Sequence, residues 1–197
     1  MPSSQITKKA IAQALKELMG RRSFDKITVA DITAGCGLNR QTFYYHFNDK
    51  YSLLNWIFDR EVMGILKSGI TLDNWQRCVL DMLEEMYKSE RFYWNALRVS
   101  PQSEFEIHLL SLAKEMFFVI IGQLAGEGQI TEGDMRFMAD FYAYGSVGII
   151  VEWAKNGMRE PPEQLMAMLS HLVNDSHSVT LKRAMAAKNH DNQENMS

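Results

Sequence analysis

Two short helices with a glycine turn between them are the feature of this chain that most constrains its fold. Thr28 is a good N-cap residue, and Asp31 stands three positions later, where it can complete a capping box. The letters GCG at 35–37 end this helix in a tight turn, after which Asn39 can cap a second helix. This order predicts a helix-turn-helix, packed against a preceding helix that runs from about Thr7 to Met19.

Apolar residues at helical spacing continue through the rest of the chain. They predict helices at about 104–124 and 134–156, and a further helix that begins at Pro162. Alternating β-branched residues over the length of a strand are missing almost everywhere. We therefore expect an all-α fold, with an N-terminal three-helix helix-turn-helix domain and a C-terminal helical bundle.

Charge divides the chain into two parts. The first 50 residues, here named the head, carry eight Lys and Arg against four acidic residues, a net charge of +4. The remaining 147 residues carry 13 basic and 20 acidic side chains, a net charge of −7. This contrast indicates two different tasks. We expect the helix-turn-helix domain at 1–50, a connecting helix at 51–69, a second domain, here named the body, at 70–188, and a disordered polar tail at 189–197.

The second helix of the helix-turn-helix carries apolar and polar side chains on opposite sides. At 100° per residue Phe43 and Phe47 share one side, where they can anchor the helix to the core of the head. Gln41 and Tyr45 point the other way, and Arg40 lies in the first turn. Because Arg and Gln form bidentate hydrogen bonds to guanine and adenine edges, this face suits the major groove of DNA. An ordinary surface helix is the alternative, but caps, turn, face geometry and local charge all favour DNA.

The segment at 27–54, ITVADITAGCGLNRQTFYYHFNDKYSLL, resembles the DNA-binding segment of TetR-type transcriptional regulators. The shared pattern runs from a Thr-capped helix through a Gly turn into T-[FL]-Y-x-H-F and a polar-Lys start of the next helix. The likeness covers roughly the first quarter of the chain. It departs at Ala30, where some members have an Arg that makes an extra base contact. Base reading here would therefore depend more on Arg40 and Gln41.

The resemblance implies roles for individual side chains of the head. Arg40, Gln41 and Thr42 would contact bases. His46 and Lys50 lie near the positive N-terminus of the next helix, which also suits phosphate binding. The residues that would hold the DNA backbone are Thr28, Tyr44, Tyr45, His46 and Lys50.

In the body, the letters FYAYGSVGIIVEWAKNG and PEQL resemble a subgroup of the family that includes regulators of dihydroxyacetone kinase operons. The family usually keeps an effector cavity among the body helices, and its last two helices commonly form a four-helix dimer seam. Any single aromatic or His in the body is nevertheless more often a core residue than a ligand contact. The candidate pocket residues are Trp94, His108, Phe117, Phe141 and Tyr142. The candidate dimer seam consists of Gly145, Gly148, Ile149, Leu165, Leu169 and Leu172.

The sequence lacks the motifs of other functional classes. Cys36 and Cys78 form no CxxC pair, and no His pair has a ligand-forming spacing, so we expect neither a disulfide framework nor a metal site. The S-x-x-K match at Ser111 lacks its companion motifs, so we expect no enzyme and no cofactor. No apolar run approaches the ~18 residues of a membrane span, and the N-terminus does not read as a signal peptide. We expect a cytoplasmic protein that does not enter a membrane.

These observations together predict a DNA-binding regulator that binds a palindromic operator as a homodimer. A small molecule or a partner protein would act on the body and shift the population of dimers toward the right or the wrong spacing of recognition helices. One alternative is an operon activator controlled by a partner protein. A second is a helical protein-interaction adaptor without operator binding, and a third is a small helical enzyme built around the body cavity.

Overall fold

The computed structural model describes residues 2–66, 69–98, 104–125 and 130–171. These residues form helices and turns without any strand, which confirms the all-α prediction. The elements in chain order are α1 (Pro2–Met19), η1 (Phe24–Lys26), α2 (Val29–Gly35), α3 (Arg40–His46), α4 (Lys50–Phe58), η2 (Asp59–Met63), α5 (Gly64–Leu66), α6 (Trp75–Lys88), α7 (Glu90–Ala96), α8 (Glu104–Ala125) and α9 (Glu132–Lys155), followed by a helix at 162–171. Leu172 and the expected tail at 189–197 lie outside the described residues.

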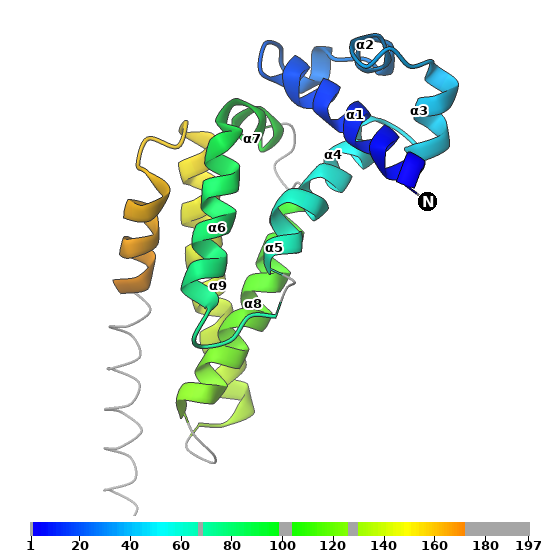
Figure 1. Ribbon diagram of the computed structural model, residues 1–197. Helices are drawn as coiled ribbons and strands as arrows, with labels where there is room; N and C mark the ends of the chain where they lie inside the picture. The colour runs from blue at the N-terminus through cyan, green and yellow to red at the C-terminus, as the bar shows by residue number, and fades with distance from the viewer. Residues whose placement is uncertain (1, 67–68, 99–103, 126–129, 172–197) are drawn as a thin grey trace, which may run out of the picture.

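The head lies at one end of an elongated molecule, and α4, η2 and α5 lead from it into the body (Figure 1). Helices α6, α8 and α9 run along the length of the body, and the short α7 covers the end that faces the head. The helix at 162–171 lies beside α6, where Ser170 Oγ is 3.4 Å from Gln76 Nε2. This arrangement leaves α2 and α3 on the side of the head away from the body.

One contiguous hydrophobic cluster joins the head to the body. It extends from Ile11 in α1 to Leu169 near the C-terminal end of the described residues. Phe58 lies at the junction, because its ring centroid is 6.0 Å from Phe92, 5.8 Å from Tyr93 and 4.5 Å from Phe105. The connecting helix, α7 and α8 therefore share one aromatic core, and the head is packed on the body as well as tethered to it.

The connecting helix is continuous from Lys50 to Leu66, but it changes its winding on the way. Residues Asp59–Met63 form a π-helical turn between α4 and α5. Such turns are rare and frequently occur at functional sites. Nothing in the spacing of apolar residues had indicated this interruption.

Helix α8 has an apolar composition that extends over most of its length. The stretch Phe105–Leu124 has a mean hydropathy of 1.5, and it is the one helix among the described residues that is long and apolar enough to cross a membrane. The expectation that no apolar run approaches that length was therefore wrong for α8, because its few charged residues do not offset its apolar ones. The core helix of a soluble protein has the same composition. In this structure one face of α8 packs against α9, where Phe117 lies 5.7 Å from Tyr142 between ring centroids.

Candidate nucleic-acid interface

The start of α2 is fixed by a reciprocal cap, as the sequence predicted. The Asp31 backbone N–H donates to Thr28 Oγ1 over 3.2 Å, and the Thr28 backbone N–H donates to Asp31 Oδ2 over 2.8 Å. The Thr28 hydroxyl also donates to Asp31 Oδ2 over 2.7 Å. This hydroxyl bond, the backbone bond from Thr28 and the nearby Arg22 guanidinium hold the pKa of Asp31 below its usual value. The cap is therefore complete above the usual Asp pKa and is lost as pH falls through the lowered one.

The turn between α2 and α3 depends on one glycine in the left-handed region. Gly37 has φ +67°, a conformation that side chains with a Cβ rarely adopt. Its N–H donates to the Ala34 carbonyl, and the Leu38 N–H donates to the Thr33 carbonyl over 2.9 Å. These two bonds form a Schellman motif, which ends α2 and redirects the chain toward α3.

Helix α3 presents one face to the core and the other to solvent. The Asn39 side chain caps it by accepting from the Thr42 N–H over 2.8 Å, and Phe43 and Phe47 are buried on its inner side. Tyr44 and Tyr45 are 56% and 83% exposed, which leaves both rings available to a partner. Arg40 and Gln41 are exposed as well, while Thr42 and His46 are half-buried.

Three predicted DNA contacts already have partners inside the head, and the first is Thr28, whose hydroxyl donates to Asp31 in the cap of α2. The Thr42 hydroxyl donates to Asn39 Oδ1 over 3.0 Å, so its oxygen as an acceptor and its methyl group are the parts left for a base. Lys50 Nζ donates to the carbonyls of Phe24, Asp25 and Ile27 over 2.9, 3.3 and 3.0 Å. An ammonium group has three N–H donors, so these three carbonyls use its full capacity. As placed, Lys50 ties the start of α4 to η1, and its ammonium lies 4.5 Å from the centroid of the Phe24 ring.

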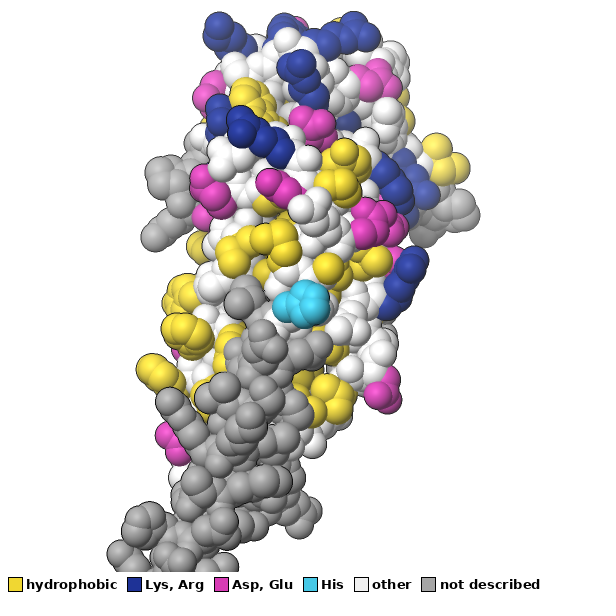
Figure 2. Space-filling model, turned by 90° about the vertical axis from the view of Figure 1, so that its left-hand side faces the viewer, with side chains coloured by type: hydrophobic (Ala, Val, Ile, Leu, Met, Phe, Trp, Pro, Cys, Tyr) yellow, Lys and Arg dark blue, Asp and Glu magenta, His cyan; other side chains and the backbone are white. Residues whose placement is uncertain are grey.

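Lys and Arg side chains gather at the head end of the molecule, as Figure 2 shows for one of its sides. Hydrophobic side chains are exposed farther down the same side, over the body. Basic side chains of the head are thus concentrated at one end of the molecule, with acidic ones among them. A basic end with an exposed polar and aromatic helix has the composition of a DNA-binding surface.

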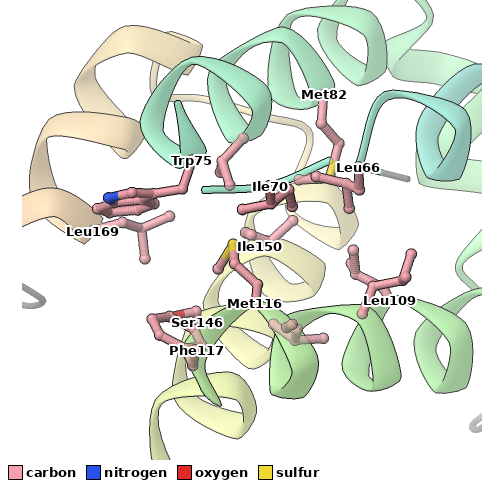
Figure 3. A pocket seen from close by; sticks show the side chains of 14 residues that line it. Leu66, Ile70, Trp75, Met82, Leu109, Met116, Phe117, Ser146, Ile150 and Leu169 are labelled. Carbon is pink, nitrogen blue, oxygen red and sulfur yellow. The ribbon is translucent and has the colours of Figure 1, made fainter. Parts of the chain in front are cut away.

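The body encloses an apolar cavity of about 30 Å³ between α6, α8 and α9 (Figure 3). Trp75 and Met82 reach it from α6, and Leu109 and Met116 reach it from α8. Among the described residues of its lining, the Ser146 hydroxyl and the Trp75 indole N–H are the polar side-chain groups. Of the five candidate pocket residues, the structure places Phe117 in this lining. The stripe of Trp75, Val79 and Met82 was visible in the sequence, but its spacing is also that of ordinary core packing.

The other four candidate pocket residues lie elsewhere. Tyr142 packs behind Phe117, and Phe141 is 69% exposed on α9. Trp94 lies under the Arg98 guanidinium, 4.1 Å from the ring centroid. His108 lines an open surface recess between α4, η2 and α8.

The candidate dimer seam separates into two groups. Gly145 and Gly148 lie on an open face of α9, where a Cβ at either position would have no neighbour within 4 Å, and Ile149 is 41% exposed beside them. Leu165 and Leu169 instead pack inside the chain, with 4% and 5% of their surface exposed. The exposed aromatic residues of α9 that lie outside the candidate seam are Phe137, Phe141 and Tyr144.

Comparison with known proteins gives two family matches. Residues 11–57 match the model of bacterial regulatory proteins, tetR family. Residues 73–175, more than half of the chain, match the model of the C-terminal region of TetR transcriptional regulators.

Within the part of the chain that the structure describes, no group of three or more His, Cys, Asp and Glu is arranged to hold a metal ion.

One curated relative is the HTH-type dhaKLM operon transcriptional activator DhaS of Lactococcus lactis. It is 34% identical over 93 residues, which are 47% of this chain and 50% of the relative, so the match spans half of its length. The solved dihydroxyacetone kinase operon activator DhaS has a TM-score of 0.74 at 24% identity, covering 88% of this chain and 97% of that one. NalD, the secondary repressor of the MexAB-OprM multidrug efflux pump in Pseudomonas aeruginosa, has a TM-score of 0.57 at 16% identity, with 87% and 97% covered. Both structures share the fold.

The contacts of Lys50 lead to a prediction about stability. Lys50→Met keeps the aliphatic stem but removes the ammonium from all three carbonyls, so the free energy of unfolding should fall by about 1–3 kcal/mol. Urea unfolding followed by circular dichroism measures the change. Lys9→Met, at an exposed position on α1, is the matched control and should change it by less than about 0.5 kcal/mol. Equal stability of the two variants would contradict a structural role for the Lys50 bonds to the three carbonyls. It would instead favour Lys50 as a phosphate contact.

Proposed function

The chain belongs to the TetR family of bacterial regulatory proteins, and from this premise we propose that it is a cytoplasmic homodimer that binds a palindromic DNA operator and regulates transcription. The observation that carries the proposal is the exposed face of α3. Arg40, Gln41, Tyr44 and Tyr45 project from a helix whose other side is anchored by a buried Phe43. A capped helix with a buried anchor and a polar outer face fits the major groove.

Within the proposed interface, each side chain has a chemistry that suits its position. Arg40 and Gln41 would read guanine and adenine edges, and the Thr42 methyl would contact a thymine methyl. The Tyr44 and Tyr45 hydroxyls and His46 would donate to phosphate oxygens, beside Thr28 at the start of α2. Lys50 would contribute to phosphate binding only after leaving its three carbonyl partners, so its main contribution would be to the shape of the head.

The open faces of α8 and α9 would form the dimer seam. Phe137, Phe141, Tyr144 and Ile149 expose a long apolar row on α9, and Ile107 and Val119 add exposed apolar surface on α8. Gly145 and Gly148 would let the partner helix approach closely. Exposed apolar side chains in such a row suit an interface, and their burial would stabilise the dimer.

Polar contacts at this face hold α8 and α9 together, so that both helices can present one surface to a second copy of the chain. Lys114 pairs with Asp140 over 3.1 Å, and this hydrogen bond raises the pKa of Lys114. The Lys114 ammonium also lies 4.6 Å from the centroid of the Tyr144 ring. The two helices would therefore meet a second copy as one rigid surface. Two-fold symmetry would then place the recognition helices about one DNA turn, ~34 Å, apart.

We expect a partner protein that binds the body to control DNA binding, instead of a metabolite that binds in the apolar cavity. The cavity holds about 30 Å³, whereas ligand pockets usually have ~300–1,000 Å³. Among the described residues, Ser146 and the Trp75 indole supply its polar side-chain groups, too few for a polar metabolite. The 34% identity to an operon activator further supports activation of an operon of the dihydroxyacetone kinase type.

A first prediction concerns base reading by Arg40. Arg40→Ala should lower affinity for the preferred duplex by about 1–3 kcal/mol and relax the preference at one base pair in each half-site. Selection of bound duplexes from a random pool, performed for the wild type and the variant, measures both effects. Arg91→Ala, on the exposed side of α7 in the body, is the matched control. An unchanged preference in Arg40→Ala would favour the adaptor alternative.

A second prediction concerns the dimer seam. A Cβ at Gly148 meets nothing within the chain, so Gly148→Trp should leave the fold of one subunit intact. In the proposed seam the same indole would overpack the interface, at a cost of about 1–3 kcal/mol per copy. Sedimentation at micromolar concentration should show weaker dimers, and operator affinity should fall in parallel. Glu163→Trp, at an exposed position on the helix at 162–171, should do neither. A Gly148→Trp dimer of wild-type strength would place the seam on another face.

A third prediction concerns the cavity. Ala113 lines it and is 9% exposed, so Ala113→Val would fill part of the space and change stability by less than about 1.5 kcal/mol. An operon reporter in cells should keep its full response, because no effector has to enter. Ala167→Val, the same exchange at an exposed position, is the control. A folded, DNA-binding Ala113→Val variant whose reporter no longer responds would show that the effector occupies the cavity.

A further inference from the structure

Asn95 of α7 is a buried side chain whose hydrogen bonds all cross from the body to the head. It is 7% exposed, and Thr33 is the one other polar residue buried to this degree among the described residues. Asn95 Nδ2 donates to the carbonyls of Met19 and Arg22 over 3.1 and 2.6 Å. Asn95 Oδ1 accepts from the Phe24 N–H over 3.1 Å. Both amide hydrogens and the oxygen are therefore satisfied by backbone that lies 71 to 76 residues away in sequence.

The backbone that Asn95 binds determines where the helix-turn-helix begins. Met19 is the last residue of α1, and Phe24 is the first residue of η1, which ends just before the Thr28 cap of α2. Lys50 binds the same η1 segment through its carbonyls. Figure 1 shows α7 next to the C-terminal end of α1, between the head and the long helices of the body. The segment before α2 is thus held by the body through α7 and by the connecting helix through Lys50.

A second set of contacts reinforces this junction. Glu61, in the π-helical turn, pairs with Lys16 of α1 over 2.6 Å and lies 3.5 Å from the Tyr93 hydroxyl of α7. Burial first, and then the Glu61 carboxylate, raises the pKa of Tyr93 well above its usual value, so the phenol keeps the proton that it donates. Residues 93 and 95 therefore fix α7 to both the connecting helix and the head.

Just beyond the C-terminal end of α7, a further contact reaches the helix that we assign to the dimer seam. An Arg98 guanidinium N–H donates to the carbonyl of Lys155, the last residue of α9, over 3.0 Å. The Lys155 ammonium pairs with Glu106 of α8 over 2.7 Å. A continuous series of contacts thus runs from α8 and α9 through α7 to the backbone that precedes α2.

We propose that Asn95 is a positioning residue that sets the orientation of the head on the body, and thereby the spacing of the two recognition helices in the dimer. The inference rests on the proposed function and adds a specific route between body and DNA. Without Asn95, a buried N–H and two carbonyls lose their partner, while the head keeps its own core around Phe43. The head would then remain folded but would adopt several orientations about the connecting helix.

The test uses full-length chains with Asn95→Ala and Asn95→Asp. The first removes all three hydrogen bonds, and the second keeps the size and the acceptor but places a carboxylate against two carbonyls. Asn74→Ala is the matched control, because Asn74 also bonds backbone, accepting from the Thr71 N–H and donating to the Gly69 carbonyl, but within the body. Comparing two variants separates a specific effect from a general loss of folding, which circular dichroism monitors.

The first measurement reads head orientation without DNA. Nitroxide labels are attached at Ala34→Cys on α2 and Glu163→Cys in the body, both exposed positions, with Cys36→Ser and Cys78→Ser removing the native thiols. Labelled chains are diluted with unlabelled ones, so that pulsed electron spin resonance reports distances within a chain. We expect one narrow distance distribution for the wild type and Asn74→Ala, and a broader one for both Asn95 variants.

The second measurement reads the spacing of the heads with DNA. Affinities are determined for the selected operator and for the same half-sites moved one base pair apart. The wild type should prefer the original spacing, and Asn95→Ala should lose about tenfold of this preference, because only a fraction of its heads is correctly oriented. Narrow distances and an unchanged spacing preference in both Asn95 variants would overturn the inference and leave Asn95 a merely stabilising residue. A wild type that binds no duplex would refute the proposed function, while the distance measurement would still decide the role of Asn95.

Discussion

A helix of seven residues cannot hold its shape alone in water, and the interface proposed for DNA depends on such a helix. The structure supplies the missing stability through tertiary contacts. Asn39 caps the first turn of α3, the Gly37 motif fixes its approach, and the rings of Phe43 and Phe47 are buried beneath it. The outer face is therefore free to carry Arg40 and two exposed tyrosines, which contribute little to packing. Stability and recognition are assigned to opposite sides of one short helix.

The position of that helix relative to the rest of the protein depends on a segment with little regular structure. Residues 20–27 connect α1 to α2, and their backbone groups are bound from two directions. Lys50 donates to three of their carbonyls from the side of the connecting helix. From the side of the body, Asn95 binds the Phe24 N–H and the Arg22 carbonyl, together with the Met19 carbonyl at the end of α1. Because both partners use side chains with several hydrogen-bonding groups, they hold orientation as well as distance. The body can thus influence the head by a route other than the connecting helix itself.

Local signals explain which features could be predicted from the sequence. The caps at Thr28 and Asn39 involve residues three positions apart, so the letters alone indicated them. The same is true of the anchoring pair Phe43 and Phe47, which follows from helical periodicity. Contacts over long sequence distances could not be read in this way. How distant helices meet decides the Asn95 bonds, the carbonyl partners of Lys50 and the inward packing of Leu165 and Leu169. Helical spacing alone cannot tell a residue that lines a cavity from one in the core. It also cannot tell a residue in a dimer seam from one buried inside the subunit.

The central claim is that two heads bind one DNA duplex in successive turns of the major groove. Hydroxyl-radical footprinting of the wild-type protein on a selected duplex tests this claim most directly, because it maps backbone protection at single-nucleotide resolution. We expect two protected regions related by two-fold symmetry, with centres about one helical turn, ~34 Å, apart, and protection that weakens steeply as salt rises. A single protected region, or a duplex that remains unprotected at low salt, would contradict it.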